Sequence, residues 1–185
     1  METGTSATPQ TNSELQALLD LLNRTEQLFL SALENVSAEQ ACFKTAPERW
    51  SIAGIAEHAV SVEELLHQLL GSATPSTEET NSVIDEKIHR FAASRTRVVP
   101  SPEGAHPRGR FPGLADSAAE FRQVRQKSRQ YAQQNAPNLR ALRVRHPVAG
   151  NIDAYQCLLL LAYHPQRHIG QIDEIKSHAD YPRNG

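Results

Sequence analysis

Residues 157–168 read CLLLLAYHPQRH and join the longest apolar run of the chain to two histidines. We predict a long helix here, from about Asn151 as its N-cap to about Ser177. In a helix, His164 and His168 lie one turn apart on one face, about 6 Å along the axis. That face carries the apolar stripe of the helix. The stretch therefore predicts a helix that turns a pair of imidazoles toward the protein interior.

Apolar residues at helical spacing predict three further amphipathic helices, over about 13–36, 51–71 and 114–135. Ser13 and Ser51 are the expected N-caps of the first two. Strand-like alternation lasts only a few residues anywhere in the chain, so no strand is predicted. Four amphipathic helices predict an all-α fold, an antiparallel four-helix bundle. Such bundles commonly build metal sites from side chains that face inward.

The connection between the second and third helices, residues 72–112, contains five prolines, and only about 78–95 could form a short helix. A connection this long predicts a crossover along the bundle rather than a tight hairpin. The polar residues 1–12 are expected to be a disordered lead. We expect residues 13–178 to form one domain and residues 179–185 to form a tail.

Composition and charge exclude several classes of protein. A net charge of −2 gives no electrostatic footprint for nucleic acid, and the basic residues from Arg122 to Arg145 are assigned to a solvated helix face. No apolar run approaches the roughly 20 residues of a membrane span. The N-terminus lacks the pattern of a signal peptide, which favours a cytoplasmic protein. Two cysteines, Cys42 and Cys157, give no disulfide framework, so reduced thiols are expected.

His58 is the best candidate for a third ligand beside His164 and His168. On the second helix it lies about 40° from Val62, within the apolar stripe. Buried imidazoles without partners would be costly. Pro165 also stands between the paired histidines, and a proline inside a helix costs about 3 kcal/mol. Such local rule-breaking is expected where a site needs a particular geometry.

Three histidines would leave a coordination position open, which is typical of catalytic rather than structural metal sites. Zinc, nickel and iron(II) all accept imidazole ligands. Gln171 could line the cavity or orient a ligand, Arg167 could lie at the pocket edge, and Glu57 is either a base or a surface carboxylate. Cys157 is expected to be a buried, inert thiol. The remaining histidines are expected at the surface: His67, His89, His106, His146 and His178.

Two other interpretations of the histidines stay open. They could be ordinary core residues packed without a metal, which predicts no stoichiometric metal in the purified protein. They could also hold a metal that only stabilises a binding or stress-response module. The helical H-E-x-x-H motif of metalloproteases is missing, because Pro165 stands where that motif has its glutamate.

Three motifs together resemble the DinB/YfiT-like superfamily. They are W-S-I at 50–52 followed by Glu57-His58, then H-P-x-x-G at 146–150, and H-x-x-R-H-x-x-Q-I at 164–172. The resemblance covers residues 14–178. It implies a four-helix bundle of up-down-down-up type, with a long connection between helices 2 and 3. It also implies one divalent metal ion held by the histidines at these positions: His58, His164 and His168.

The resemblance leaves the reaction open, because folds do not fix functions. Known members include S-transferases and isomerases that use low-molecular-weight thiols, and proteins described as metal-dependent hydrolases. We therefore expect a metal-dependent transferase with such a thiol, or a metal-dependent hydrolase, acting on a small-molecule substrate. The alternative is a non-catalytic metal-stabilised module. The family also implies frequent dimerisation, so a homodimer is an expectation.

Overall fold

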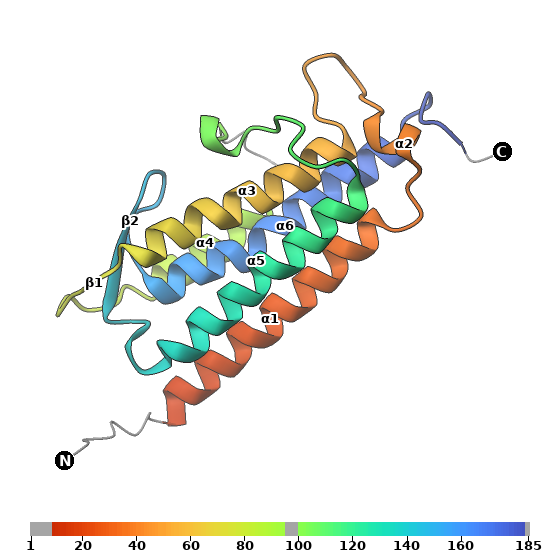
Figure 1. Cartoon of the computed structure of the whole chain (residues 1–185). Coiled ribbons are helices and arrows are strands. Elements are labelled where there is room, and N and C mark those ends of the chain that lie inside the picture. Colours follow the sequence, from red (N-terminus) through yellow and green to blue (C-terminus); the bar gives the residue numbers. More distant parts are fainter. Residues whose placement is uncertain (1–8, 95–99, 184–185) are drawn as a thin grey trace.

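The computed structural model describes residues 9–94 and 100–183. Four long helices lie side by side (Figure 1): α1 (Pro9–Leu33), α3 (Ile52–Gly71), α5 (Leu114–Gln134) and α6 (Ala154–Lys176). α1 and α3 each pack against both α5 and α6. The chain runs in one direction along α1 and α6 and in the opposite direction along α3 and α5 (Figure 1). The fold is mostly helical, as predicted.

Shorter elements occupy the connections. They are α2 (Ala38–Cys42), α4 (Val83–Ala93) and two 3-10 turns at Glu103–Ala105 and Ala136–Asn138. α4 packs against α6, and the first 3-10 turn packs against α3. α3 ends near the sheet, whereas α5 begins at the other end of the molecule (Figure 1). The described parts of the segment between them thus lie against α6 and against α3.

The prediction that the chain contains no strands was wrong. β1 (Thr74–Pro75), β2 (Leu142–His146) and β3 (Gly150–Asp153) form an antiparallel sheet in that order. Val144 and Ile152 pair across β2 and β3, and both are buried. Strands of two to five residues are too short for an alternating pattern to stand out from chance.

The sheet also moves the start of the last helix. Asn151, the predicted N-cap, lies in β3, and Asp153 caps α6 instead. The Asp153 carboxylate accepts from the Gln156 backbone N–H at 2.7 Å, and the Gln156 side chain accepts from the Asp153 N–H at 3.0 Å. This reciprocal capping box satisfies donors that the first turn would otherwise leave unpaired.

The other predicted helix starts had mixed outcomes. Ser51 does cap α3, and its hydroxyl accepts from the Gly54 N–H at 3.2 Å. α1 begins at Pro9, four residues before the predicted cap at Ser13. Proline is well suited to the first position of a helix, because its missing N–H would have no partner there. Part of the predicted lead is thus helical, and residues 1–8 lie outside the described residues.

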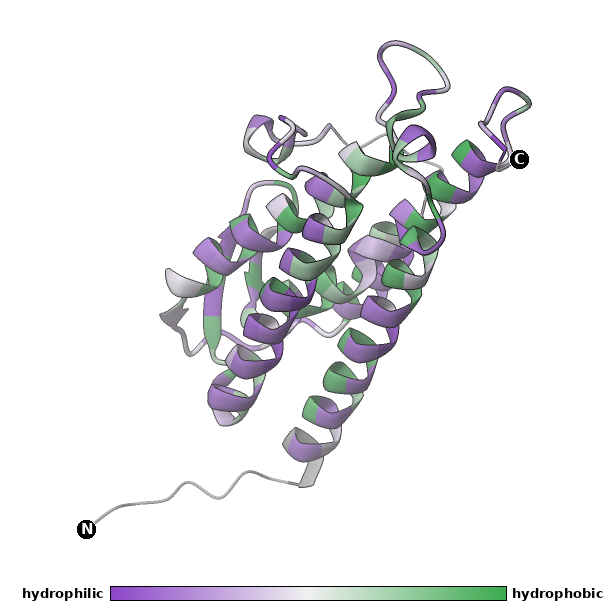
Figure 2. Cartoon of the chain, turned by 45° about the vertical axis from the view of Figure 1, so that its right-hand side comes forward, coloured by the Kyte–Doolittle hydropathy of each residue, from purple (hydrophilic) through white to green (hydrophobic). Residues whose placement is uncertain are grey.

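The core consists of two clusters of buried side chains along the four long helices. One contains Leu18, Leu22 and Leu161; the other contains Phe29, Phe121 and Ile172. Each long helix carries hydrophobic and hydrophilic residues along its whole length (Figure 2), as an amphipathic helix requires. On α6 the histidine pair follows Leu161 and precedes Ile172. Among the described residues, no helix has the length and apolar character needed to cross a membrane.

Candidate metal centre

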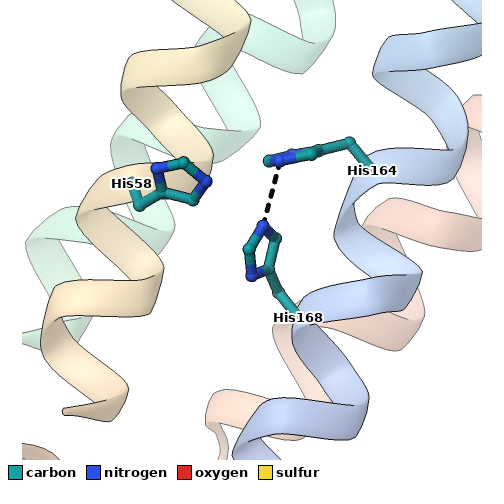
Figure 3. Close-up of side chains that lie close together, drawn as sticks. All are labelled: His58, His164 and His168. Atoms are coloured by element: carbon teal, nitrogen blue, oxygen red, sulfur yellow. Dashed lines mark hydrogen bonds between the residues drawn. The ribbon is translucent and has the colours of Figure 1, made fainter. Parts of the chain in front are cut away.

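Three histidines from two helices converge between α3 and α6. His58 on α3 faces His164 and His168 on α6 (Figure 3). Their ring centroids lie 5.2 Å (His58–His164), 4.8 Å (His58–His168) and 4.4 Å (His164–His168) apart. One ring nitrogen of each lies within 4.8 Å of the others. The residues predicted from spacing are therefore brought together.

Hydrogen bonds fix the orientation of two of these rings. The Nδ1–H of His58 donates to the Ala105 carbonyl at 2.8 Å, which leaves Nε2 as the nitrogen with a lone pair. Nδ1 of His168 donates in the same way to Oε1 of Gln171, at 2.6 Å. Partners of this kind fix the tautomer and ring direction of metal-binding histidines. Gln171 thus lies where a residue that orients His168 should lie.

The donor set fits one divalent ion. Nε2 of His168 lies 3.0 Å from Nε2 of His164. Two imidazole nitrogens bound to one tetrahedral zinc ion, each at 2.0–2.1 Å, lie about 3.3 Å apart. Imidazole nitrogens suit zinc, nickel and iron(II) alike. The pair needs almost no adjustment, and His58 completes the set from the other helix.

Burial favours the neutral form of His58 and His164. His58 and His168 are 4% and 3% exposed, while part of His164 reaches solvent. Burial lowers the pKa of His58, and the hydrogen bond to Ala105 offsets that effect only in part. The pKa of His164 is held well below its usual value, first by burial and then by the neighbouring histidines, Arg125 and Arg167. Neutral rings have the free lone pairs that a metal needs.

Acidification is expected to release a bound metal. Binding adds to the stability of the neutral rings, so protons must displace the ion as well as protonate imidazoles whose pKa is already lowered. We therefore expect full occupancy at pH 7 and loss between about pH 6 and pH 4, below the ordinary titration range of histidine near 6.5. Elemental analysis after dialysis across this range measures it. Retention of metal at pH 4 would contradict ligation by histidines alone.

Comparison with known proteins agrees with this geometry. Residues 21–172 match the sequence profile of the DinB superfamily. The chain belongs to the DinB superfamily. A search of curated proteins finds no significant match. YfiT from Bacillus subtilis, described as a probable metal-dependent hydrolase with an unusual four-helix bundle topology, has a similar fold. Its TM-score is 0.57 at 14% identity, over 95% of this chain and 91% of YfiT.

Pro165, between the two histidines of this DinB-superfamily chain, lies inside α6 and is buried. Proline has no N–H to donate to the carbonyl four residues earlier, which here belongs to Leu161. The Nη2 group of Arg125 on α5 donates to that carbonyl instead, at 3.1 Å. The helix therefore continues through the proline, because a side chain from another helix replaces the missing donor.

Arg125, which lies on α5 near the three histidines, was placed wrongly by the sequence analysis. It was assigned to a solvated face but is 0% exposed and forms an ion pair with Glu63, which is 2% exposed. The signal was present: on the helical wheel Arg125 lies about 40° from Phe121 and 60° from Ser128, both of which are buried. Burial raises the pKa of Glu63 to about 7 although the charge of Arg125 opposes it.

The ion pair connects to a histidine that was predicted to be an ordinary surface residue. Ser128 donates to Glu63 at 3.1 Å, and its Oγ lies 2.9 Å from Nε2 of His67. His67 is half-buried, and burial lowers its pKa. The prediction of a surface histidine was therefore wrong for His67. Arg125, Glu63, Ser128 and His67 thus form a connected set of polar side chains between α5 and α3. The set reaches α6 at Leu161, about one helical turn before His164.

The remaining candidates lie around the three histidines in different roles. Glu57, considered as a base or a surface carboxylate, is not at the surface: it is buried, and its oxygens accept from backbone N–H groups of residues 108–110. Arg167 donates to the carbonyl of Ser94, at the end of α4, near enough to His164 to lower its pKa. Cys157 is fully buried, and burial raises the pKa of its thiol to about 12, so it is an inert thiol.

Proposed function

We propose that this chain is a divalent-metal-dependent hydrolase of a small-molecule substrate, with His58, His164 and His168 as the metal ligands. The convergence of these three imidazoles carries the proposal. Three protein ligands leave at least one coordination position for water or substrate, as catalytic sites require. A structural role alone would favour a fourth protein ligand.

In such a reaction the protein would orient the ligand histidines and supply positive charge near the metal. A divalent ion held here supplies Lewis acidity and makes water more acidic. Ala105 and Gln171 hold two of the rings in fixed directions. The positive charges of Arg125 and Arg167 act on His164 and so reach the centre. Fixed positive charge favours negative charge that develops on a substrate oxygen during hydrolysis.

Hydrolysis is favoured over thiol transfer by the structural comparison. YfiT, which has a similar fold, is described as a probable metal-dependent hydrolase. The buried Cys157, with its pKa raised to about 12, is no thiol nucleophile, so a transferase would need a low-molecular-weight thiol from solution. Thiol transfer is therefore the second outcome that an assay should include.

Activity should depend on the loaded metal and on the three ligands together. The wild-type protein, loaded with zinc, nickel or iron(II), is assayed with panels of small esters and amides, with and without low-molecular-weight thiols and electrophiles. We expect hydrolysis by the loaded protein and only background rates in the metal-free protein and in His168→Ala. Stoichiometric metal without turnover in any panel would favour the non-catalytic, metal-stabilised module. Turnover only with thiols would assign a transferase.

A further inference from the structure

The loop between the 3-10 turn Glu103–Ala105 and α5 is fastened to α3 by the side chain of Glu57. This carboxylate is 3% exposed and accepts hydrogen bonds from three consecutive backbone N–H groups. The donors are Arg108 at 2.6 Å, Gly109 at 2.9 Å and Arg110 at 3.1 Å. Bonds to an ionised acceptor are about twice as strong as neutral ones. The carboxylate of Glu57 is thus committed to holding the loop.

The backbone of the loop is shaped for this contact. Gly109 has φ +75°, a left-handed conformation that side chains other than glycine rarely adopt. A turn of this kind lets successive N–H groups converge on one anion. A Cβ added at Gly109 would meet no atom within 4 Å. A substitution there would therefore strain the backbone conformation without creating a steric clash.

The 3-10 turn from which this loop continues contacts the residue next to Glu57 on α3, the proposed ligand His58. The carbonyl of Ala105, a fully buried residue, accepts from Nδ1–H of His58 at 2.8 Å. Pro107 lies against Gly54, 3.4 Å from where a Cβ on Gly54 would stand. The Trp50 ring packs on the His58 ring at 4.6 Å between centroids. The loop is thus in direct contact with the helix around His58.

We propose that Glu57 is a positioning residue for His58 and acts through this loop. Glu57 and His58 are adjacent but project about 100° apart on the helix. Glu57 therefore accepts from the N–H groups of the loop, while His58 donates to the Ala105 carbonyl. The loop thereby keeps the proton of His58 on Nδ1 and directs Nε2 toward the other two histidines. The expected effect of Glu57 on metal binding rests on the metal centre proposed above. Its effect on the tautomer of His58 does not require a metal.

Replacing Glu57 by glutamine tests the inference in the metal-free protein. The amide has one acceptor oxygen in place of two and sets an NH2 group against N–H donors, so the loop should detach. Imidazole 15N shifts should show that His58 loses its Nδ1–H tautomer, while His168, held by Gln171, keeps its own. Added zinc should then bind about 10- to 100-fold more weakly, as for other outer partners of metal-binding histidines.

A second variant changes the backbone of the loop itself and leaves the sequence of α3 unchanged. Gly109→Val should release the loop through backbone strain and change the His58 tautomer as Glu57→Gln does. Gly150→Val is the matched control, because Gly150 has φ +74° in equally open space but lies in the sheet. Glu64→Gln is a second control, since Glu64 links the same loop to α3 through the Arg110 guanidinium, in a partly exposed pair at 2.7 and 2.9 Å, and not through the loop backbone.

The outcomes separate this inference from the proposed function. If His58 keeps its Nδ1–H in both Glu57→Gln and Gly109→Val, or if Gly150→Val changes it equally, Glu57 does not position His58. If the wild-type protein binds none of zinc, nickel and iron(II), the proposed function fails, whereas the tautomer measurement still decides the role of Glu57.

Discussion

The purified His168→Ala variant is expected to contain no stoichiometric metal, whereas the wild-type protein contains about one divalent ion per chain. Zinc affinities of about 10–16 kcal/mol for structural sites with four ligands imply roughly 3 kcal/mol for each ligand. Loss of one of only three ligands should therefore weaken binding by 100-fold or more. Elemental analysis and titration with a competing chelator measure the change, and His58→Ala and His164→Ala should behave alike.

His89→Ala is the matched control for these variants. His89 is an exposed histidine on α4 and lies outside the three-histidine cluster. Its replacement should leave both metal content and affinity unchanged. A wild-type protein without metal under loading conditions would show that the three histidines are ordinary packed residues. Unchanged metal content in His168→Ala would show that the ion is held elsewhere.

Arg125→Met is expected to lower the free energy of unfolding by about 3–5 kcal/mol, the usual cost of breaking one side of a buried ion pair. The variant leaves the Glu63 carboxylate buried without its counter-charge and the Leu161 carbonyl without its donor. Urea unfolding followed by circular dichroism measures the change. Arg90→Met, which removes a fully surface-exposed pair with Glu86, should have almost no effect.

A double variant separates the ion pair from simple loss of packing. Burial raises the pKa of Glu63 despite the charge of Arg125, so taking this carboxylate out of water works against the attraction within the pair. Adding Glu63→Leu to Arg125→Met should therefore restore most of the lost stability. If the double variant is as unstable as the single one, the cost arises from the cavity or from the Leu161 carbonyl.

The long helices and the histidine cluster were accessible from sequence because each depends on a local period. Apolar residues repeat over many turns in every long helix, and two ligands lie four residues apart on one of them. His58 was placed by its position on an apolar stripe. The family resemblance then supplied what periodicity lacks, namely that these stripes face the same point.

Contacts between distant segments were not accessible in this way. The strands were missed because each is stabilised by its partner rather than by its own pattern. Glu57 was misjudged because its partners are backbone N–H groups 51 to 53 residues away, which carry no side-chain signal. Arg125 was misjudged for the opposite reason. Its position on the buried stripe was visible, but a charged residue there requires a partner that sequence could not name.

The proline inside α6 has a consequence for descent within the superfamily. Pro165 leaves a carbonyl without a donor, Arg125 supplies the donor, and Glu63 balances the charge that Arg125 brings into the interior. A lineage that lost the arginine or the acid alone would carry an unpaired buried group until another residue changed. We therefore expect the arginine and the acid to be inherited together in lineages that carry the proline.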